Sequence, residues 1–535
     1  MMNFERLQTP QHDGDVLVEP ATTSWAQLIE RNIHSRTTEQ AGLELAGVPI
    51  DVVRQQTRAK IVDAYLPHSP STSHISPIIA CGHQPEFVHP GVWAKHVVVH
   101  HVAQQLGMLG IDLVVDHDVP RSTTLAIPTL HNKLHDHLLS IRHVPVLSGT
   151  AGVTYESRAA LSANDVEHLT HELEPHDPSM MNTYCRELAQ FASQSENSSA
   201  DFVDQHLAAR ECVDRSLAAT LFEVRVSRTF GGPFVTDILL NIDRFASAYN
   251  ESLAEYQRQQ QIRQPDRPLP SLKRDGDRFE TPFWIYQPGQ PRQRLWIASH
   301  GDTLELWAGV GSQAVGTLSR ADLLREPSDT ILKTLSPWVI QPRALTLTLW
   351  ARLLACDLFV HGIGGAKYDR ITDDILRRYY QCKPPAYACV SATLRLPLPH
   401  HNVTAADEWA ARRRLRECQF NPQRYLQPPT DSPSRQQLAE LLAERERLIA
   451  ESRRLHEQQG SRLERRTVFN HLREINALIA HLDPTLQVRL QRDLDRLSQQ
   501  RASNAIADRR DFFYALQPRD RLEQLARCLI RAVPL

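Results

Sequence analysis

The sequence has almost no net charge and no long apolar segment. Its 535 residues carry 60 Lys and Arg against 62 Asp and Glu, which gives a formal net charge of −2 and a pI near 6.9. This balance offers no electrostatic reason to bind nucleic acid. No apolar run reaches the roughly 18 residues of a membrane span. The first residues, MMNFERLQTPQHDGD, lack a basic segment followed by an apolar core. We therefore expect no nucleic acid and no membrane as partners, no secretory signal, and a cytoplasmic location.

Cysteine and lysine are both scarce. The eight cysteines include no C-x-x-C pair and no dense cluster, so reduced and mostly buried thiols are expected rather than a disulfide framework. Cys81 is expected to be a small apolar filler at a strand end. Only seven of the 60 basic residues are lysines, and Lys95 and Lys367 fall inside the two loop-to-helix motifs described below. An ammonium group near bound phosphate explains this placement, and so does a compositional preference for arginine.

A chain of this length is expected to form two or three domains. Residues 1–75 predict lead-in helices, near Ser24 to Asn32 and Val52 to Ala64, which end in the turn-rich PHSPSTSH. Residues 76–400 predict an α/β core with two insertions, one helical at about 160–225 and one a small antiparallel meander at about 280–310. After the meander, the α/β spacing returns with a strand at Trp338 to Ile340, a helix at Arg343 to Ala355, a strand at Leu358 to Val360 and a helix from about Ala366 to Tyr380.

Residues 401–505 have the spacing of packed helices. The repeating apolar positions are Leu441, Leu448 and Leu455, then Leu472, Ile475, Ile479 and Leu482. Pro433, Gly460 and Pro484 separate three helices. The pattern predicts an antiparallel helical or coiled-coil domain whose second seam is buried, within a helical hairpin or across a homodimer. Residues 506–535 predict a turn and an amphipathic helix that packs back on the core.

The first motif, residues 81–118, predicts a strand end, a polar loop, a helix and a second strand. The apolar run Ile75 to Ala80 predicts a buried strand, Pro90 and Gly91 open a helix that continues to Gly107, and Leu113 to Val115 forms the second strand. Polar residues occupy both junctions: His83, Gln84, Glu86 and His89, then Asp116, His117 and Asp118. Backbone N–H groups at such a helix N-terminus favour an anion, usually phosphate or carboxylate.

The second motif is Cys356 to Arg370, CDLFVHGIGGAKYDR, where an apolar strand again leads into a polar loop and a helix. Gly362, Gly364 and Gly365 permit positive φ and close approach of the backbone to a ligand, and a structural tight turn is the alternative. The motif satisfies neither G-x-x-x-x-G-K-[ST] nor a full G-x-G-x-x-G. The polar groups expected around its opening are His361, Lys367, Asp369 and Arg370.

The histidines allow two interpretations. His83, His89 and His117 with Asp116 and Asp118 contain the atoms of a metal shell. They lack the i, i+4 helical spacing of H-E-x-x-H, and loop histidines more often bind substrate or backbone, so we expect no tightly bound metal. His96, on the helix after the first loop, is expected to pack or to face solvent. His117, between two carboxylates, is expected to transfer protons near neutral pH, and the alternative is a histidine that only ties down a loop.

Taken in order, the motifs resemble the bacillithiol-biosynthesis cysteine-adding enzymes over roughly residues 75–535. That family's first motif reads G-Q-Q followed by F-x-G-P, where this chain has GHQ and FVHPG; its second ends in E-D-H-D, which Asp116, His117 and Asp118 match at the last three positions. Its third, a G-G-P-G-E-like loop, is matched only at Gly364 and Gly365, and FFYALQPRDRLEQL closes the chain in the same order.

The resemblance implies a Rossmann-like nucleotide-binding core with inserted connecting segments, and a C-terminal α-helical coiled-coil domain that supports dimerisation. It also implies a ligase-like reaction that joins the carboxyl group of cysteine to the amine of glucosaminyl-malate. Three departures change the polar lining of the site: His83 in place of Gln, the HPG turn, and HGIGGAKYD in place of the third loop. A relative that acts on another amine or acid is therefore the alternative.

These motifs predict an ATP-linked, amide-forming enzyme with small-molecule amine and amino-acid substrates. A carboxylate is a poor electrophile, so its activation needs positioned phosphates, cations and a group that accepts the amine proton. The cofactor is ATP or another adenine nucleotide, and Asp116 and Asp118 either orient the amine or hold Mg²⁺ delivered with it. The residues assigned to the nucleotide are His83, Gln84, Gly91, Lys95, Gly362, Gly364, Gly365 and Lys367. Those assigned to catalysis are His89, His117, Asp116 and Asp118.

Two other functions remain open from the sequence. One is a nucleotidyltransferase of the same superfamily, because His89-Pro90-Gly91 partly matches an H-x-G-H loop, although Val92 stands where the second histidine would be. The other is a non-catalytic nucleotide- or metabolite-binding protein whose coiled coil acts as a scaffold.

Overall fold

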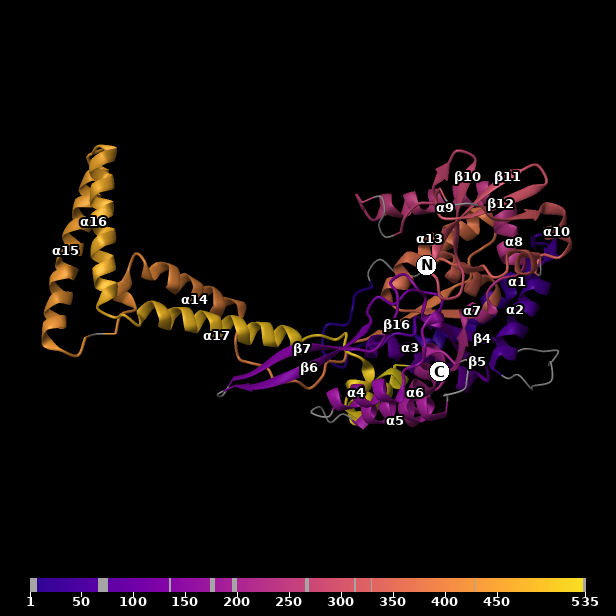
Figure 1. The fold of residues 1–535 in the computed structure, drawn as a ribbon, viewed down its shortest axis with the longest axis horizontal. Coiled ribbons are helices and arrows are strands. Elements are labelled where there is room, and N and C mark those ends of the chain that lie inside the picture. Colours follow the sequence, from indigo (N-terminus) through magenta and orange to yellow (C-terminus); the bar gives the residue numbers. More distant parts are fainter. Residues whose placement is uncertain are drawn as a thin grey trace. The chain divides into compact units, whose positions relative to one another are not determined.

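A computed structural model describes most of the chain, which divides into two compact units (Figure 1). The first unit comprises Met1–Ile127, His143–Leu396 and Arg510–Leu535, and the second comprises Pro128–Arg142 and Pro397–Arg509. The described residues are 7–65, 76–133, 136–173, 179–194, 200–264, 269–311, 314–328, 330–427 and 429–532. The predicted turn PHSPSTSH lies outside them.

A six-stranded sheet lies at the centre of the first unit. Its order is β1-β16-β15-β4-β5-β8, with β1 antiparallel to β16 and every other neighbour parallel. The strands are β1 (Val16–Glu19), β4 (Ile78–His83), β5 (Leu109–Val114), β8 (Phe222–Arg225), β15 (Leu358–His361) and β16 (Tyr387–Ala392). Numbered along the chain, the parallel strands lie in the order 3-2-1-4-5. The direction of strand addition therefore reverses between β4 and β15.

The apolar runs explain why these segments form a central sheet. Ile78 to Cys81 of β4, all of β15 and all of β16 are buried, as expected for parallel strands covered on both faces. The predicted strands at 75–80, 113–115 and 358–360 correspond to β4, β5 and β15, although β4 begins at Ile78 and β5 begins earlier, at Leu109. The sequence analysis did not predict β1, β8 or β16. β8 has only four residues, FEVR, and two of them are charged.

Most helices that were predicted for the first unit are present in the structure. The predicted lead-in helices are α1 (Trp25–Thr38) and α2 (Ile50–Tyr65), which a short hairpin of β2 (Glu44–Leu45) and β3 (Val48–Pro49) separates. The predicted helical insertion is α4 (Ala163–Leu173), α5 (Ser179–Gln194) and α6 (Phe202–Ser216). The remaining helices up to the second motif are α7 (Val226–Thr229), α8 (Pro233–Leu240), α9 (Ile242–Gln259), α10 (Arg320–Arg325), α11 (Thr330–Leu335) and α12 (Ala344–Trp350).

The helices of the two motifs both directly follow strands of the central sheet. The first, α3 (Pro90–Leu106), has Pro90 in its first turn and ends at Gly107, whose φ of 62° is the left-handed conformation that glycine favours. The second, α13 (Ile363–Tyr379), begins three residues before the predicted start at Ala366. Gly364 and Gly365 therefore belong to the first turn of a helix, and the prediction that they lie in a loop is wrong.

A second, antiparallel sheet contains the predicted meander. Its strands are β9 (Arg274–Asp275), β10 (Arg278–Tyr286), β11 (Gln293–His300), β12 (Thr303–Ala308), β13 (Ala314–Ser319) and β14 (Val339–Pro342). Strands β10, β11 and β12 confirm the meander. The prediction that Trp338 to Ile340 returns to the α/β core is wrong, because β14 pairs antiparallel with β10. A short apolar run does not reveal by itself which sheet it joins.

The last residues of the chain complete the first unit. The backbone N–H of Tyr514 donates to the Val88 carbonyl at 2.8 Å, and the Tyr514 ring stacks on Trp93 of α3 with centroids 5.5 Å apart. Helix α18 (Arg519–Arg531) follows, and its Leu522, Leu525 and Leu529 are buried. The prediction that this segment packs on the core is confirmed.

The second unit consists of helices and the outer part of one hairpin. The helices are α14 (Ala405–Cys418), α15 (Ser432–Glu457), α16 (Arg462–His481) and α17 (Leu486–Ala507), and the hairpin strands are β6 (Thr124–Lys133) and β7 (Asp136–Pro145). Helix α15 packs beside α16, and α14 packs beside α17 (Figure 1). The three helices after Pro433 were predicted, whereas α14 and the hairpin were not.

The predicted apolar seam lies inside the α15–α16 hairpin. Ile475 and Ile479 of α16 are buried against Leu448 and Leu455 of α15, with Leu472 partly buried beside them. Within the described residues, no helix combines the length and apolar character needed to cross a membrane.

Candidate functional site

The two sequence motifs meet at the carboxyl edge of the central sheet. Strands β4 and β15 are parallel neighbours, with Leu358 opposite Ile79 and Phe359 opposite Ala80. The loop that begins after His83 and the helix that begins after Gly362 therefore leave the sheet side by side. Ligands of open α/β sheets bind at this edge, where the direction of strand addition reverses. Both motifs lie at this edge.

The backbone N–H groups at the N-terminus of α3 are already hydrogen-bonded within the helix start. The N–H of Gly91 donates to Nδ1 of His89 at 3.0 Å, the N–H groups of Val92 and Trp93 donate to the His89 carbonyl, and Pro90 has no N–H. Burial and the nearby Arg510 lower the pKa of His89 to about 4, so the ring is neutral at pH 7 and can accept this bond. The prediction that the start of α3 binds an anion is therefore not supported.

Gly91 is required by packing and not by a ligand. A Cβ atom at this position would lie 2.5 Å from the Ala392 carbonyl oxygen of β16, a distance too short for any non-bonded contact. The residue lets α3 approach the sheet. The sequence analysis assigned Gly91 to nucleotide binding, and the structure gives it this different role.

The N-terminus of α13 is open. The N–H groups of Ile363, Gly364 and Gly365 have no hydrogen-bond acceptor among the residues that the structure describes, and the first helical bond is from Ala366 to Gly362. A Cβ added at Gly362 or Gly364 would meet no atom within 4 Å. Unpaired N–H groups and the helix dipole together make such a helix start attractive to an anion.

The conformational reason given for these glycines is wrong. Gly362 has φ of −81°, and Gly364 and Gly365 are helical, so none uses the positive φ that the sequence analysis invoked. Gly365 instead leaves room for a neighbouring ring, because its Cβ would lie 2.8 Å from Nδ1 of His361. What Gly362 and Gly364 provide is open space over the backbone.

The two lysines of the motifs lie in different environments. Lys95 is 3% exposed and its Nζ donates to the Gly82 carbonyl at 2.7 Å, so its ammonium group faces the sheet interior. The prediction that it neutralises phosphate charge is not supported. Lys367 is half-buried at the start of the second turn of α13. Helical side chains lean toward the helix N-terminus, so we expect the Lys367 ammonium group near the open N–H groups.

Asp116 is a structural carboxylate. It is fully buried and accepts hydrogen bonds from Nε of Arg225 at 2.7 Å and from the backbone and side chain of Ser227 at 3.0 and 2.5 Å. These bonds join the end of β5 to the end of β8. With both oxygens engaged, Asp116 is not placed to hold Mg²⁺ or orient an amine, contrary to its predicted role.

Asp118 is held by side chains from two directions. Arg292 lies 2.5 Å from its Oδ1, and Nε2 of Gln84 donates to its Oδ2 at 2.8 Å. Burial alone would raise the pKa of Asp118, but Arg292 and these hydrogen bonds outweigh it and lower the pKa. The carboxylate is therefore ionised. Gln84, predicted to bind nucleotide, instead ties the first loop to the end of β5.

His117 is enclosed and neutral. It is 2% exposed, its Nε2 lies 3.1 Å from the Pro342 carbonyl oxygen, and its Nδ1 has no hydrogen-bond partner among the described residues. Burial lowers the pKa of His117, although Asp116 and Asp118 oppose this effect. This direction favours the neutral ring at pH 7, and the contact with Pro342 agrees with the alternative role of holding a loop in place.

His83 is the last residue of β4, the strand next to β15. Its Nδ1 is 3.1 Å from the Gln84 carbonyl oxygen, and burial together with Lys95 lowers its pKa to about 3. Within the described part of the chain, His83, His89, Asp116, His117 and Asp118 do not converge on a common metal position. His83 and His89 are thus neutral imidazoles at this edge.

Glu156, a charged residue near the edge, was not predicted from the sequence. Glu156 receives a hydrogen bond from Tyr286, and burial together with Asp116 raises its pKa. Burial also raises the pKa of Glu86 in the first loop. Glu156 lies on a segment between the two motifs with no distinctive spacing, so only the hydrogen bond from its backbone N–H to the Asp116 carbonyl, at 3.1 Å, brings it here.

His361 and Asp369, expected around the opening of the second motif, are buried and paired. Nε2 of His361 lies 2.8 Å from Oδ2 of Asp369, and Arg352 donates to the same oxygen at 2.5 Å. Burial opposes ionisation of Asp369, but Arg352 and His361 lower its pKa. The pair fixes α13 against the end of β15.

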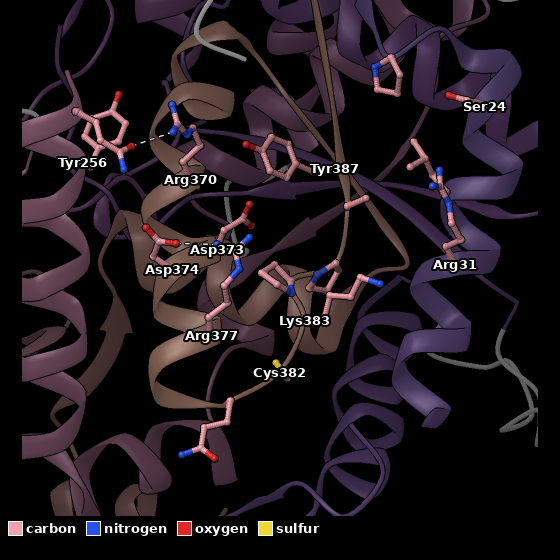
Figure 2. Close-up of a pocket in the computed structure, with 17 residues that line it drawn as sticks. Ser24, Arg31, Tyr256, Arg370, Asp373, Asp374, Arg377, Cys382, Lys383 and Tyr387 are labelled. Atoms are coloured by element: carbon pink, nitrogen blue, oxygen red, sulfur yellow. Dashed lines mark hydrogen bonds and ion pairs between the residues drawn. The ribbon is translucent and has the colours of Figure 1, made fainter. Parts of the chain in front are cut away.

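A surface groove of about 1140 Å³ has Arg370 of the second motif in its lining (Figure 2). It follows α13 and the segment before β16, and no residue assigned to the site from the sequence lines it. Its charged groups are largely paired: Asp374 with Arg377 at 2.7 Å, Asp373 with Arg352 at 2.6 Å, and Arg370 with Gln259 at 3.0 Å. The carboxyl edge of the sheet, with its unpaired N–H groups, is the better candidate site.

The chain was also compared with known protein families and curated proteins. Searches of protein-family models and of curated proteins find no match to this chain. The chemistry of the site therefore rests on its own geometry, which offers three open N–H groups at the start of α13, Lys367 on the same helix, and the neutral imidazole of His83 at the end of the neighbouring strand β4.

Proposed function

We propose that the chain is a carbon-nitrogen ligase that uses ATP, or another adenine nucleotide, to activate a carboxylate for attack by an amine. The observation that carries the proposal is the open start of α13, where three N–H groups are unpaired beside the point at which strand addition reverses. The strand order 3-2-1-4-5 supports a Rossmann-like core, since that order is typical of nucleotide-binding sheets.

The residues at this edge suit the steps of such a reaction. The N–H groups of α13 and the ammonium group of Lys367 would bind phosphate oxygens, and the space over Gly362 and Gly364 would admit them. Transfer of a phosphoryl or adenylyl group to the carboxylate releases ADP or pyrophosphate. Attack by the amine then forms the amide and releases phosphate or AMP. His83 is neutral at pH 7 because its pKa lies at about 3. Its Nδ1 donates to the Gln84 carbonyl, which leaves Nε2 to accept a hydrogen bond from the incoming amine.

The resemblance of the motifs to the bacillithiol-biosynthesis cysteine-adding enzymes supports a specific substrate pair. By that resemblance the acid is cysteine and the amine is an amino-sugar conjugate such as glucosaminyl-malate, in the synthesis of a thiol cofactor in the cytoplasm. The α15–α16 hairpin would then belong to a coiled-coil domain that supports a homodimer. Asp118 is already paired with Arg292 and Gln84, so it would not hold Mg²⁺ by itself. The ion would bind together with the nucleotide.

Product analysis tests the proposal. The purified chain is incubated with ATP and Mg²⁺, with cysteine alone, with glucosaminyl-malate alone and with both, and ADP, AMP, phosphate and pyrophosphate are measured together with the amide. A ligase cleaves ATP in proportion to the amide formed. A nucleotidyltransferase would release pyrophosphate with an acceptor but form no amide. A non-catalytic nucleotide-binding protein would bind ATP without cleaving it. Either of the last two results would overturn the proposal.

A further inference from the structure

The solvent-facing side of α14 combines exposed aromatic rings with arginines. Trp409 is 63% exposed and Phe420, just past the last turn, is 47% exposed, while Arg413 and Arg416 between them are exposed as well. These four residues follow the spacing i, i+4, i+7 and i+11, so they lie along one side of the helix. The opposite side holds Cys418, which is buried against α17. We call the four exposed residues the aromatic–arginine face.

The carboxylates of α14 do not neutralise the arginines of this face. Each of the three is engaged elsewhere: Asp407 with Thr404, Glu408 with Arg412 and Arg501, and Glu417 with Arg424 and Tyr425. By contrast, Arg413, Arg414 and Arg416 make no ion pair with any residue that the structure describes. Their positive charge can therefore attract an anion.

The helical part of the second unit carries a positive excess, although the whole chain does not. Residues 397–509 contain 19 Arg and no Lys against 15 Asp and Glu, an excess of four positive charges. The rest of the chain then carries an excess of six negative charges, because the total is −2. The expectation of no nucleic-acid partner relied on the total charge, which hides this separation. Residues 397–509 alone offer the electrostatic attraction that a polyanion needs.

The composition of the face favours single-stranded RNA over other occupants. A second copy would bring the same unpaired arginines together, and like charges repel. A membrane surface needs a continuous apolar face, whereas arginines separate the two rings here. A nucleotide combines a flat base with an anionic phosphate. The bases of unpaired RNA segments stack on aromatic rings, and arginines bind the phosphates between them.

Trp409 and Arg413 already lie together in the arrangement that a nucleotide needs. The guanidinium carbon of Arg413 is 5.7 Å from the centroid of the Trp409 ring, within the range of a cation–π contact. A base on the exposed part of this ring would therefore have a guanidinium group within reach of its phosphate. At about 1.5 Å of rise per residue, Trp409 and Phe420 lie roughly 16 Å apart along the helix, which is long enough for a few nucleotides.

We infer that the aromatic–arginine face of α14 binds single-stranded RNA. The rings of Trp409 and Phe420 stack with bases, and the guanidinium groups of Arg413 and Arg416 bind phosphates. An acidic protein segment is the competing occupant, because its carboxylates would also pair with the arginines. Such a segment supplies no planar bases for the two rings. The inference does not depend on the proposed ligase activity.

Fluorescence anisotropy of the full chain with a labelled, unstructured RNA of about 12 nucleotides tests the inference. We expect saturable binding that weakens as the salt concentration rises. Trp409→Ala should weaken binding by about fivefold or more because base stacking is lost, and Trp409→Phe should keep most of the affinity. Arg413→Gln should weaken binding and reduce the slope of log affinity against log salt by about 0.7. Arg492→Gln is the matched control, since Arg492 is an exposed arginine of α17, and it should change the dissociation constant by less than about twofold.

Competition on the unmodified chain keeps the test decisive if a variant does not fold. We expect unlabelled RNA of the same sequence to displace the label, and a poly-glutamate peptide of equal charge to do so at least about tenfold less well. Equal displacement by the peptide would overturn the inference and identify an acidic protein as the occupant. Tighter binding of the DNA of the same sequence would overturn the assignment to RNA.

Three further results would also overturn the inference. One is the absence of saturable RNA binding at about 50 mM salt, where phosphate contacts are strong. Another is an unchanged dissociation constant in folded Trp409→Ala and folded Arg413→Gln. The third is a dimer in sedimentation that Trp409→Ala dissociates, because a second copy would then cover this face.

Discussion

Gly91 and Gly364 occupy similar places in two helix starts, yet their surroundings differ. A side chain at Gly91 would collide with the Ala392 carbonyl, whereas Gly364 faces open space. The first glycine permits close packing of a helix on a sheet, and the second leaves backbone N–H groups accessible. We therefore expect substitution of Gly91 to lower stability and substitution of Gly364 to weaken ligand binding, although both glycines stand at the start of a motif helix.

Gly364→Val is expected to weaken ATP binding by about tenfold or more, because a branched side chain over the first turn of α13 disrupts charge-assisted hydrogen bonds worth roughly 1.5–3 kcal/mol each. Stability should change little, since the position is helical and no atom would be within 4 Å of the new Cβ. Calorimetric titration with ATP and thermal unfolding measure the two effects.

Gly91→Ala is the control for that experiment, and it should lower the melting temperature because of the contact with Ala392. An unchanged ATP dissociation constant in a well-folded Gly364→Val would show that α13 does not bind the nucleotide.

His89 links stability to pH through its cap on α3. Its pKa is 6.5 when unfolded and about 4 in the folded chain, so the unfolded chain binds more protons between these values. The stabilisation is complete above pH 6.5 and is lost as the pH falls toward 4. His89→Asn keeps an acceptor for the Gly91 N–H but does not titrate, and it should therefore lose less stability than the parent chain between pH 7.5 and pH 5. His89→Ala removes the cap and should cost about 1 kcal/mol at pH 7.5.

Urea unfolding of the three proteins at both pH values measures these differences. Equal pH dependence in the parent chain and His89→Asn would show that the His89 ring does not couple to folding.

At the scale of elements, the α15–α16 hairpin is held by one apolar seam. Ile479 is fully buried, while Leu478, its neighbour on α16, is 50% exposed. Adjacent residues of a helix point about 100° apart, so only one of the two reaches α15.

Ile479→Asp is expected to destabilise the helical unit by several kcal/mol, because it removes a buried side chain and places a charge in the seam. Leu478→Asp changes the same chemistry on the exposed side and should stay within about 0.5 kcal/mol of the parent chain. Far-ultraviolet circular dichroism during urea unfolding compares them. Equal destabilisation by both variants would mean that Leu478 is also covered, as it would be in a dimer.

At the scale of the molecule, the last residues of the chain stabilise the first unit. The Tyr514 hydroxyl donates to Oδ1 of Asp214 at 2.8 Å in the buried interior. Tyr514→Phe leaves this carboxylate with one donor fewer, and we expect a loss of roughly 1–3 kcal/mol. Tyr368→Phe, at a position that is 42% exposed, is the matched control and should have little effect. Thermal unfolding of both variants checks the expectation, and equal melting temperatures would contradict it.

Much of the fold could be predicted from local patterns. The apolar runs gave β4 and β15, Pro90 and Gly107 marked the ends of α3, and heptad spacing gave the α15–α16 hairpin. The strands β1, β8 and β16 could not be predicted in the same way. They are short, and a strand is stable only with its partners in a sheet.

The candidate site was predicted only in its location. Both motifs do end at one edge of the sheet, but Asp116, His117 and Lys95 turn away from solvent into bonds with Arg225, Pro342 and Gly82. Those partners lie on other elements, and nothing in the spacing of the motif reveals them.

The sequence by itself determined where the long helices and the strands β4, β5 and β15 form, because those choices depend on residues a few positions apart. Only the tertiary structure decided which helix start is open. The answer depends on the His89 ring and the Ala392 carbonyl at α3, and on empty space at α13. It also decided that Cys81, His96 and Asp112 meet in one cluster, because β4, α3 and β5 come together only when the sheet and its covering helix have packed.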